Sequence, residues 1–172
     1  RPVPCAFSGN LATEIAGKTR FRARLASAPL GMIGVLVSTP AAAHLHAHSE
    51  YSLLDGHCKI EAMAARAAEL GQPALGLTDH GVMNGALDMY KACRANDIKP
   101  ILGIEAYFVD DRHEAKNMGR YERNHLTLLA ENNTGFSNLV ALSSEGFLEG
   151  YHRGKANVDM ELLERHSEGV IV

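Results

Sequence analysis

Three histidines and an aspartate lie close together in the segment HLHAHSEYSLLD, which runs from His44 to Asp55. Alternate side chains of an extended strand point to the same face, so His44, His46 and His48 would share one face. Neutral imidazole binds zinc, manganese and iron, and carboxylate oxygens complete such sites. The segment therefore favours a divalent-metal site over a histidine-rich surface strand.

Further candidate ligands occur downstream, near the ends of apolar segments. Asp79 and His80 follow residues 73–78, Glu105 lies inside the apolar run 100–109, and His125 begins the run 125–130. An unpaired carboxylate among apolar neighbours is costly, and an opposing cation removes that cost. A buried salt bridge for Glu105 and a hydrogen-bonded core histidine for His125 are the alternatives for each residue alone. The joint pattern favours a metal cluster.

Elements that could position these residues alternate along the chain from residue 41. Hydrophobic periodicity predicts a helix over 60–70 that ends at Gly71, because Gly commonly follows the last helical residue. Repeated strand–helix units indicate a parallel sheet or barrel, whose active site forms at the carboxyl ends of the strands. The predicted strands are 42–48, 73–78, 100–109, 125–130 and 169–172, the helices are 60–70, 84–96, 135–145 and 159–166, and residues 110–123 form a polar loop.

Composition sets the class of protein. The chain has 172 residues and is 46% hydrophobic, which is enough for one domain with a core. A net charge of −3 does not indicate a nucleic-acid surface, although a catalytic cleft could still be locally basic. No apolar run reaches the length of a membrane helix. The three cysteines form no CxxC pair, and we expect a reducing, cytoplasmic compartment.

Residues 1–40 differ from the rest and predict a domain boundary near residue 40. Their order of basic residues, an apolar run and small residues imitates a signal peptide, but cleavage there would remove the strand that presents the histidines. We expect instead a non-homologous or disordered extension in which Met32 is the natural start. The chain begins at Arg1 and stops within a predicted strand, so we expect a piece of a longer protein.

Five segments together resemble the PHP (polymerase and histidinol phosphatase) family. More narrowly, they resemble the PHP domain in the alpha subunit of bacterial DNA polymerase III, a replicative polymerase of the C family. The similarity covers residues 43–172. The segments are HLHAHSEYSLLDG at 44–56, PALGLTDHG at 73–81, IKPILGIEAY at 98–107, NHLTLLA at 124–130 and LSSEGFLEG at 142–150.

This resemblance implies an α/β fold, an incomplete and distorted (β/α)7 TIM-like barrel that is truncated at its C-terminus. It implies up to three divalent ions, zinc or manganese, with further ligands beyond residue 172. His44 would not be a ligand and would lie deeper in the barrel. The implied ligands are His46, His48, Asp55, His80, Glu105 and His125, of which His46, His48, Asp55 and Glu105 would carry the catalysis.

The implied function is a metal-dependent phosphoesterase, specifically a 3′–5′ proofreading exonuclease that acts on the 3′ end of a DNA strand beside other replicase subunits. Clustered divalent ions favour in-line attack of water on a phosphodiester. Tyr51 and Arg153 could position a phosphate. One alternative is a non-catalytic module that stabilises the polymerase and contacts a separate exonuclease subunit. Another is a free-standing phosphoesterase of the histidinol-phosphatase type, although YHRG after residue 150 favours the polymerase branch.

Overall fold

The computed structural model describes residues 42–114, 117 and 123–172. The chain separates into two units, Arg1–Pro40 and Ala41–Val172, and every described residue belongs to the second. The expectations for residues 1–40, including the start at Met32 and the signal-like order, therefore lie outside the described residues.

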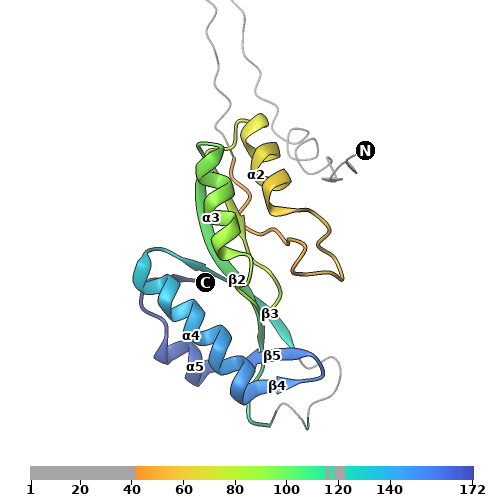
Figure 1. Cartoon of the computed structure of the whole chain (residues 1–172). Coiled ribbons are helices and arrows are strands. Elements are labelled where there is room, and N and C mark those ends of the chain that lie inside the picture. The colour runs from red at the N-terminus through yellow and green to blue at the C-terminus, as the bar shows by residue number, and fades with distance from the viewer. Residues whose placement is uncertain (1–41, 115–116, 118–122) are drawn as a thin grey trace, which may run out of the picture. The chain divides into compact units, whose positions relative to one another are not determined.

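The described residues form a mixed α/β fold in which helices pack against a sheet (Figure 1). None of the described helices is both long and apolar enough to cross a lipid bilayer. The helices are α2 (Ile60–Glu69), α3 (Ala86–Ala95), α4 (Asn133–Gly150) and α5 (Met160–Arg165), and the strands are β1 (Ala74–Leu77), β2 (Lys99–Phe108), β3 (Asn124–Ala130), β4 (Tyr151–His152), β5 (Lys155–Val158) and β6 (Val170–Ile171).

Strand β2 is the centre of the sheet. Its first half pairs with β1 in parallel, from Ala74 opposite Lys99 to Leu77 opposite Leu102. Its second half pairs with β3 in antiparallel fashion, and its last two residues pair with β5 in parallel. Strands β1, β3 and β5 are therefore all positioned by this one strand.

The prediction of a purely parallel sheet is wrong, because β3 runs antiparallel to β2 and β6 runs antiparallel to β3. A parallel partner requires a long crossover, usually a helix. The described residues between Phe108 and Asn124 hold no α-helix, so the chain returns beside β2 in the opposite direction.

Strands β4 and β5 form a hairpin that the sequence did not predict. Its two-residue turn is Arg153-Gly154, and both residues have positive φ, 50° and 78°. A type I′ turn requires positive φ at both central positions and favours Asn-Gly or Asp-Gly. An arginine at the first position hides this signal.

The histidine segment 42–48 is extended, as predicted, but it is not a full strand. It joins β1 through a single parallel bridge between His44 and Leu75, and the Gly76 amide donates to the His44 carbonyl oxygen at 2.7 Å. A Cβ atom at position 76 would lie 2.5 Å from the Leu45 carbonyl oxygen. Glycine at this position is what allows the segment to lie against β1.

Two hydrophobic cores meet along β2. The first joins α2, α3 and β1, and the second joins the end of β2 to β3, α4 and α5. Because each core fixes one half of β2, the strand is held rigidly where the two halves meet. Central members are Ile60, Met63, Leu75, Met89 and Cys93 in the first core, and Ile104, Leu128, Leu139, Leu142 and Leu162 in the second.

A buried ion pair secures the chain that leaves β2. The Arg112 guanidinium donates to Asp159 at 2.8 Å and to Glu149 at 2.8 Å, and Asp159 also caps α5 by accepting from the Leu162 amide at 3.1 Å. Burial alone would raise the pKa of Asp159. Hydrogen bonds from the Arg112 and Leu162 amides and from the Arg112 guanidinium outweigh burial and lower this pKa below its ordinary value of 3.8.

We expect Asp159→Asn to lower the free energy of unfolding by about 3 kcal/mol, because the buried Arg112 charge then keeps only its more exposed partners, Glu149 and Glu161. A carboxyl whose folded pKa is depressed stabilises the fold above its unfolded pKa. The stability lost in Asp159→Asn should therefore be greatest above pH ~5, and this loss should shrink as the pH falls through the lowered pKa of Asp159. Urea unfolding of the chain at several pH values measures it.

The matched control is Glu161→Gln, since Glu161 also contacts Arg112 but its side chain is 64% exposed. Removal of an exposed partner should cost less than about 1 kcal/mol. Equal losses for the two variants would contradict the assigned role of Asp159.

Candidate metal centre

The alternation of side chains along β2 orients Glu105. Its neighbours Ile104 and Ala106 pack into the second core, so Glu105 and Tyr107 project from the opposite face. On β3, His125 pairs with Tyr107. Since directly opposite residues share a face of the sheet, His125 lies beside Glu105.

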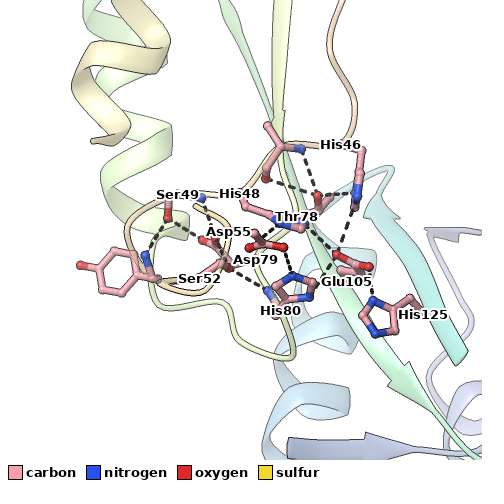
Figure 2. Close-up of polar contacts among 12 residues, drawn as sticks. His46, His48, Ser49, Ser52, Asp55, Thr78, Asp79, His80, Glu105 and His125 are labelled. Atoms are coloured by element: carbon pink, nitrogen blue, oxygen red, sulfur yellow. Dashed lines mark hydrogen bonds and ion pairs between the residues drawn. The ribbon is translucent and has the colours of Figure 1, made fainter. Parts of the chain in front are cut away.

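The Glu105 carboxylate gathers four imidazoles around it (Figure 2). Its Oε2 atom lies 2.6 Å from His48 Nε2, 3.2 Å from His80 Nδ1 and 3.7 Å from His46 Nε2. Its Oε1 atom lies 2.5 Å from His125 Nδ1. The histidines come from the segment before β1, the loop after β1, and β3, so the cluster joins three parts of the chain.

Asp55 contacts His48 and His80 through the ring nitrogens that do not face Glu105. Its Oδ1 atom lies 3.1 Å from His48 Nδ1 and its Oδ2 atom 2.8 Å from His80 Nε2. Burial alone would raise the pKa of Asp55, but hydrogen bonds from His80 and His48 outweigh it and lower that pKa. The pKa of Glu105 is likewise lowered, since the His125 hydrogen bond and the nearby histidines outweigh burial. Both carboxyls are therefore anions at neutral pH.

All six ligands that the family resemblance implied come together in the structure. They form three overlapping groups in which the candidate ligand atoms lie within 4.8 Å of one another. Whether they bind metal remains a prediction. The groups are His46–His48–Glu105, His48–Asp55–His80 and His80–Glu105–His125.

The chemistry of this cluster fits a divalent cation. His48 Nε2, His80 Nδ1 and Glu105 Oε2 are buried and converge on one another, but their contacts at 2.6 and 3.2 Å lack hydrogen-bond geometry, and none of the three atoms has another hydrogen-bond partner among the described residues. Buried polar atoms are normally satisfied, and such exceptions need an explanation. Glu105 is only 6% exposed, yet no lysine or arginine of the described residues forms an ion pair with it. An ion pair with a lysine or an arginine therefore does not account for it, and the histidines that contact it could, together with the carboxylate, hold zinc or manganese.

Asp79 holds the loop between His48 and Asp55 in place. It is buried, accepts from the Ser49 amide and the Ser52 hydroxyl at 2.7 Å each, and also accepts from the Ser49 hydroxyl at 2.7 Å. The Ser52 hydroxyl oxygen in turn accepts from the His80 amide at 3.0 Å. The sequence analysis named Asp79 as a candidate ligand, but it belongs to none of the three groups. The serines between His48 and Asp55 are the signal that could have revealed this support.

The backbone fixes the register of His80 against Glu105. The Glu105 amide donates to the Asp79 carbonyl at 3.0 Å, and the Gly81 amide donates to the Glu105 carbonyl at 2.8 Å. Gly81 has a φ of 66°, which a side chain would disfavour. Thr78 adds a hydrogen bond between its hydroxyl and His46 Nδ1, at 2.8 Å. His80 and His46 are thus held in position within the described chain itself.

Three expectations about nearby residues need correction or remain open. His44 is exposed and belongs to none of the groups above, so the expectation that it lies deeper is wrong. It lies two positions before His46, the nearest member of the cluster, and an extended chain carries it roughly 7 Å beyond that residue. The Tyr51 hydroxyl donates to Asp88 at 3.5 Å and Arg153 is exposed in a turn, so a role in phosphate positioning remains a prediction.

A buried cluster of histidines and carboxylates at the end of β1 and on the central strand could hold divalent ions, which can activate water. The chain belongs to the PHP family, since the family model described as the PHP domain matches residues 44–172.

Relatives with high sequence identity bear the name DNA polymerase III subunit alpha. One from Treponema pallidum is 48% identical over 132 residues, which cover 74% of this chain and 11% of that protein. Those from Helicobacter pylori strain 26695 and Mycobacterium tuberculosis strain H37Rv are 44% and 42% identical, covering 74% and 75% of this chain and 10% and 12% of theirs. The chain thus spans about a tenth of the length of the curated relatives it matches.

An amidohydrolase structure from Chromobacterium violaceum has a TM-score of 0.40 and 23% identity, over 61% of this chain and 34% of that one, and has no bearing on function.

We expect His48→Ala and Glu105→Ala to remove most bound divalent metal, because His48 belongs to two of the three groups and so does Glu105. His44→Ala should leave metal content nearly unchanged. Elemental analysis of the dialysed proteins, after incubation with zinc or manganese, measures the difference. Loss of metal in His44→Ala but not in His48→Ala would show that the ligand pair has been assigned two residues too late.

Proposed function

We propose that this chain is the N-terminal PHP portion of a DNA polymerase III alpha subunit and that its cluster hydrolyses the phosphodiester at the 3′ end of a DNA strand. The observation that carries the proposal is the buried Glu105 carboxylate, which is surrounded by imidazoles and lacks any lysine or arginine partner among the described residues. The complete domain would be a distorted (β/α)7 barrel, of which this chain supplies the first part.

The three ligand groups would hold up to three divalent ions, zinc or manganese. Such ions lower the pKa of bound water toward neutrality and stabilise the attacking and leaving oxygens of a phosphodiester. Glu105 is shared by two groups and Asp55 orients His48 and His80. Carboxylates that orient imidazoles strengthen them as ligands.

Substrate access is supported by the uneven exposure of the cluster. The side chains of His46 and His125 are 48% and 47% exposed, whereas those of His48 and His80 are only 15% exposed. The half-exposed histidines would form the mouth at which a phosphate enters. The buried pair and Glu105 would form its floor, where few waters can compete with the substrate.

The relatives support the polymerase context, because their name favours an attached domain over a free-standing phosphoesterase. In that context the other replicase subunits are partners and the cytoplasm is the location. Exonuclease activity would then serve proofreading.

A structural module is the second candidate, because the ligands come from separate parts of the chain. A metal bound there would cross-link the histidine segment, the end of β1, β2 and β3, and metal binding in such a site contributes to folding. This candidate predicts bound metal without hydrolysis.

We expect His48→Ala and Glu105→Ala in the full-length gene product to reduce 3′–5′ degradation of a primer at least about 100-fold, as loss of a metal ligand or its support does. Primer extension on the same preparation should persist, since the polymerising carboxylates would lie outside this chain. Degradation and extension are measured with one labelled primer–template.

His44→Ala is the control and should degrade the primer as the wild type does. Retained degradation by both cluster variants, with no second nuclease in the preparation, would contradict the proposed function. Bound metal with no degradation by the wild type would favour the structural module.

A further inference from the structure

A cleft of about 330 Å³ lies next to the metal cluster. One wall is the loop at residues 51–54, and the other is the end of α4 with the β4–β5 hairpin. His80 and Tyr107 line the cleft as well, and His80 is also a member of the cluster. A ligand in the cleft would therefore adjoin the candidate metal ligands.

A stack of rings connects the cleft to the cluster. The Tyr107 and His80 rings are nearly parallel, with an interplanar angle of 14° and centroids 5.8 Å apart. The Lys155 ammonium lies 4.4 Å from the centroid of the Tyr107 ring and donates a hydrogen bond to the Tyr107 hydroxyl. This lysine is thereby held in the cleft rather than extended into solvent.

Lys155 lacks an acidic partner. It is partly buried, yet it forms no ion pair with any carboxylate of the described residues. A partly buried cation is stabilised by an anion, and a phosphate would supply one. The charge of the cleft is thus complementary to a phosphate ester.

Aromatic rings give the cleft a stacking surface. Phe147 lies in the last turn of α4 and Tyr151 begins β4 directly after that helix, with their ring centroids 4.8 Å apart. They are 56% and 54% exposed although both are large and apolar. Exposed aromatic rings beside a cation are the usual elements of a site for single-stranded nucleic acid, because every base has a face that can stack.

We propose that this cleft holds one nucleotide of a single-stranded substrate, with its base against Phe147 and Tyr151 and a phosphate on Lys155. The proposal rests on the function proposed above, since a neighbouring phosphodiester would then reach the cluster past His80. It goes beyond that function by assigning the residues that hold the strand.

The test measures binding without catalysis. A short single-stranded oligonucleotide with 2-aminopurine as its 3′-terminal base is titrated with the 172-residue chain in EDTA, so that no hydrolysis occurs. Stacking in the cleft should quench the 2-aminopurine fluorescence. Tyr151→Ala and Phe147→Ala should each weaken binding roughly tenfold, as loss of one stacked base does, and should reduce the quench.

Leu148→Ala is the matched control, because Leu148 lies on the same helix and is 80% exposed but does not line the cleft. It should bind as the wild type does. An oligonucleotide whose terminal nucleotide is abasic, followed by the anisotropy of a fluorescent label at its 5′ end, should bind about as weakly to the wild type as the normal oligonucleotide binds to Tyr151→Ala, and Tyr151→Ala should not weaken it further. If Tyr151→Ala weakened the binding of the abasic oligonucleotide as much as it weakens that of the normal one, the stacking role would be overturned.

The phosphate contact has its own readout, the salt dependence of binding. Each neutralised phosphate of a single strand contributes about 0.7 to the slope of log K against log salt concentration. Lys155→Gln should reduce the slope by about that amount, and Lys155→Arg should restore it. An unchanged slope in Lys155→Gln would overturn this contact.

These outcomes separate the cleft from the catalytic proposal. Cleft variants that bind as the wild type does, or a wild type that does not bind the oligonucleotide, would overturn the cleft proposal even if the full-length protein degrades primers. Binding that depends on the cleft, in a protein that degrades no primer, would support the cleft and contradict the exonuclease.

Discussion

A carboxylate buried on the central strand constrains this whole structure. Glu105 is 6% exposed, and burial opposes its charge, yet its pKa is lowered rather than raised. The neighbouring imidazoles are what reverse the effect of burial. They can do so only because the histidine segment, the end of β1, and β3 all meet β2 at the same point. The position of each of these segments is therefore coupled to one charged group.

The supporting contacts divide into two sets on either side of that point. Asp79 fixes the loop that carries Asp55, and it does so through buried hydrogen bonds to two serines. Arg112 fixes the chain beyond β2 through Asp159 and Glu149. The two cores lie behind these contacts, one for each half of β2. The cluster thus lies between two independently stabilised halves, which is an arrangement that can hold ligands rigidly for a metal ion.

Sequence reasoning succeeded where the signal was local. The helix predicted over 60–70 is α2, Gly71 follows its end with a φ of 69°, and the apolar run around Glu105 is β2. The family resemblance named six residues as ligands, and these residues lie in one cluster although they are far apart in the chain, while their metal binding stays a prediction. It could not reveal the antiparallel direction of β3, because strand direction depends on how the chain returns through a loop of weak pattern. Nor could periodicity place His44, since a shared strand face does not fix distance from the cluster. The cleft was missed because Phe147, Tyr151 and Lys155 meet only after the unpredicted hairpin has formed.

The central claim is that the cluster around Glu105 is a metal centre, and anomalous diffraction tests it most directly. Crystals of the chain grown with zinc or manganese would be measured above and below the absorption edge of the metal. The account predicts anomalous peaks bounded by His48, His80 and Glu105, within coordination distance of the buried nitrogen and oxygen atoms that lack hydrogen bonds. Peaks elsewhere, or none in this cluster at saturating metal, would contradict it.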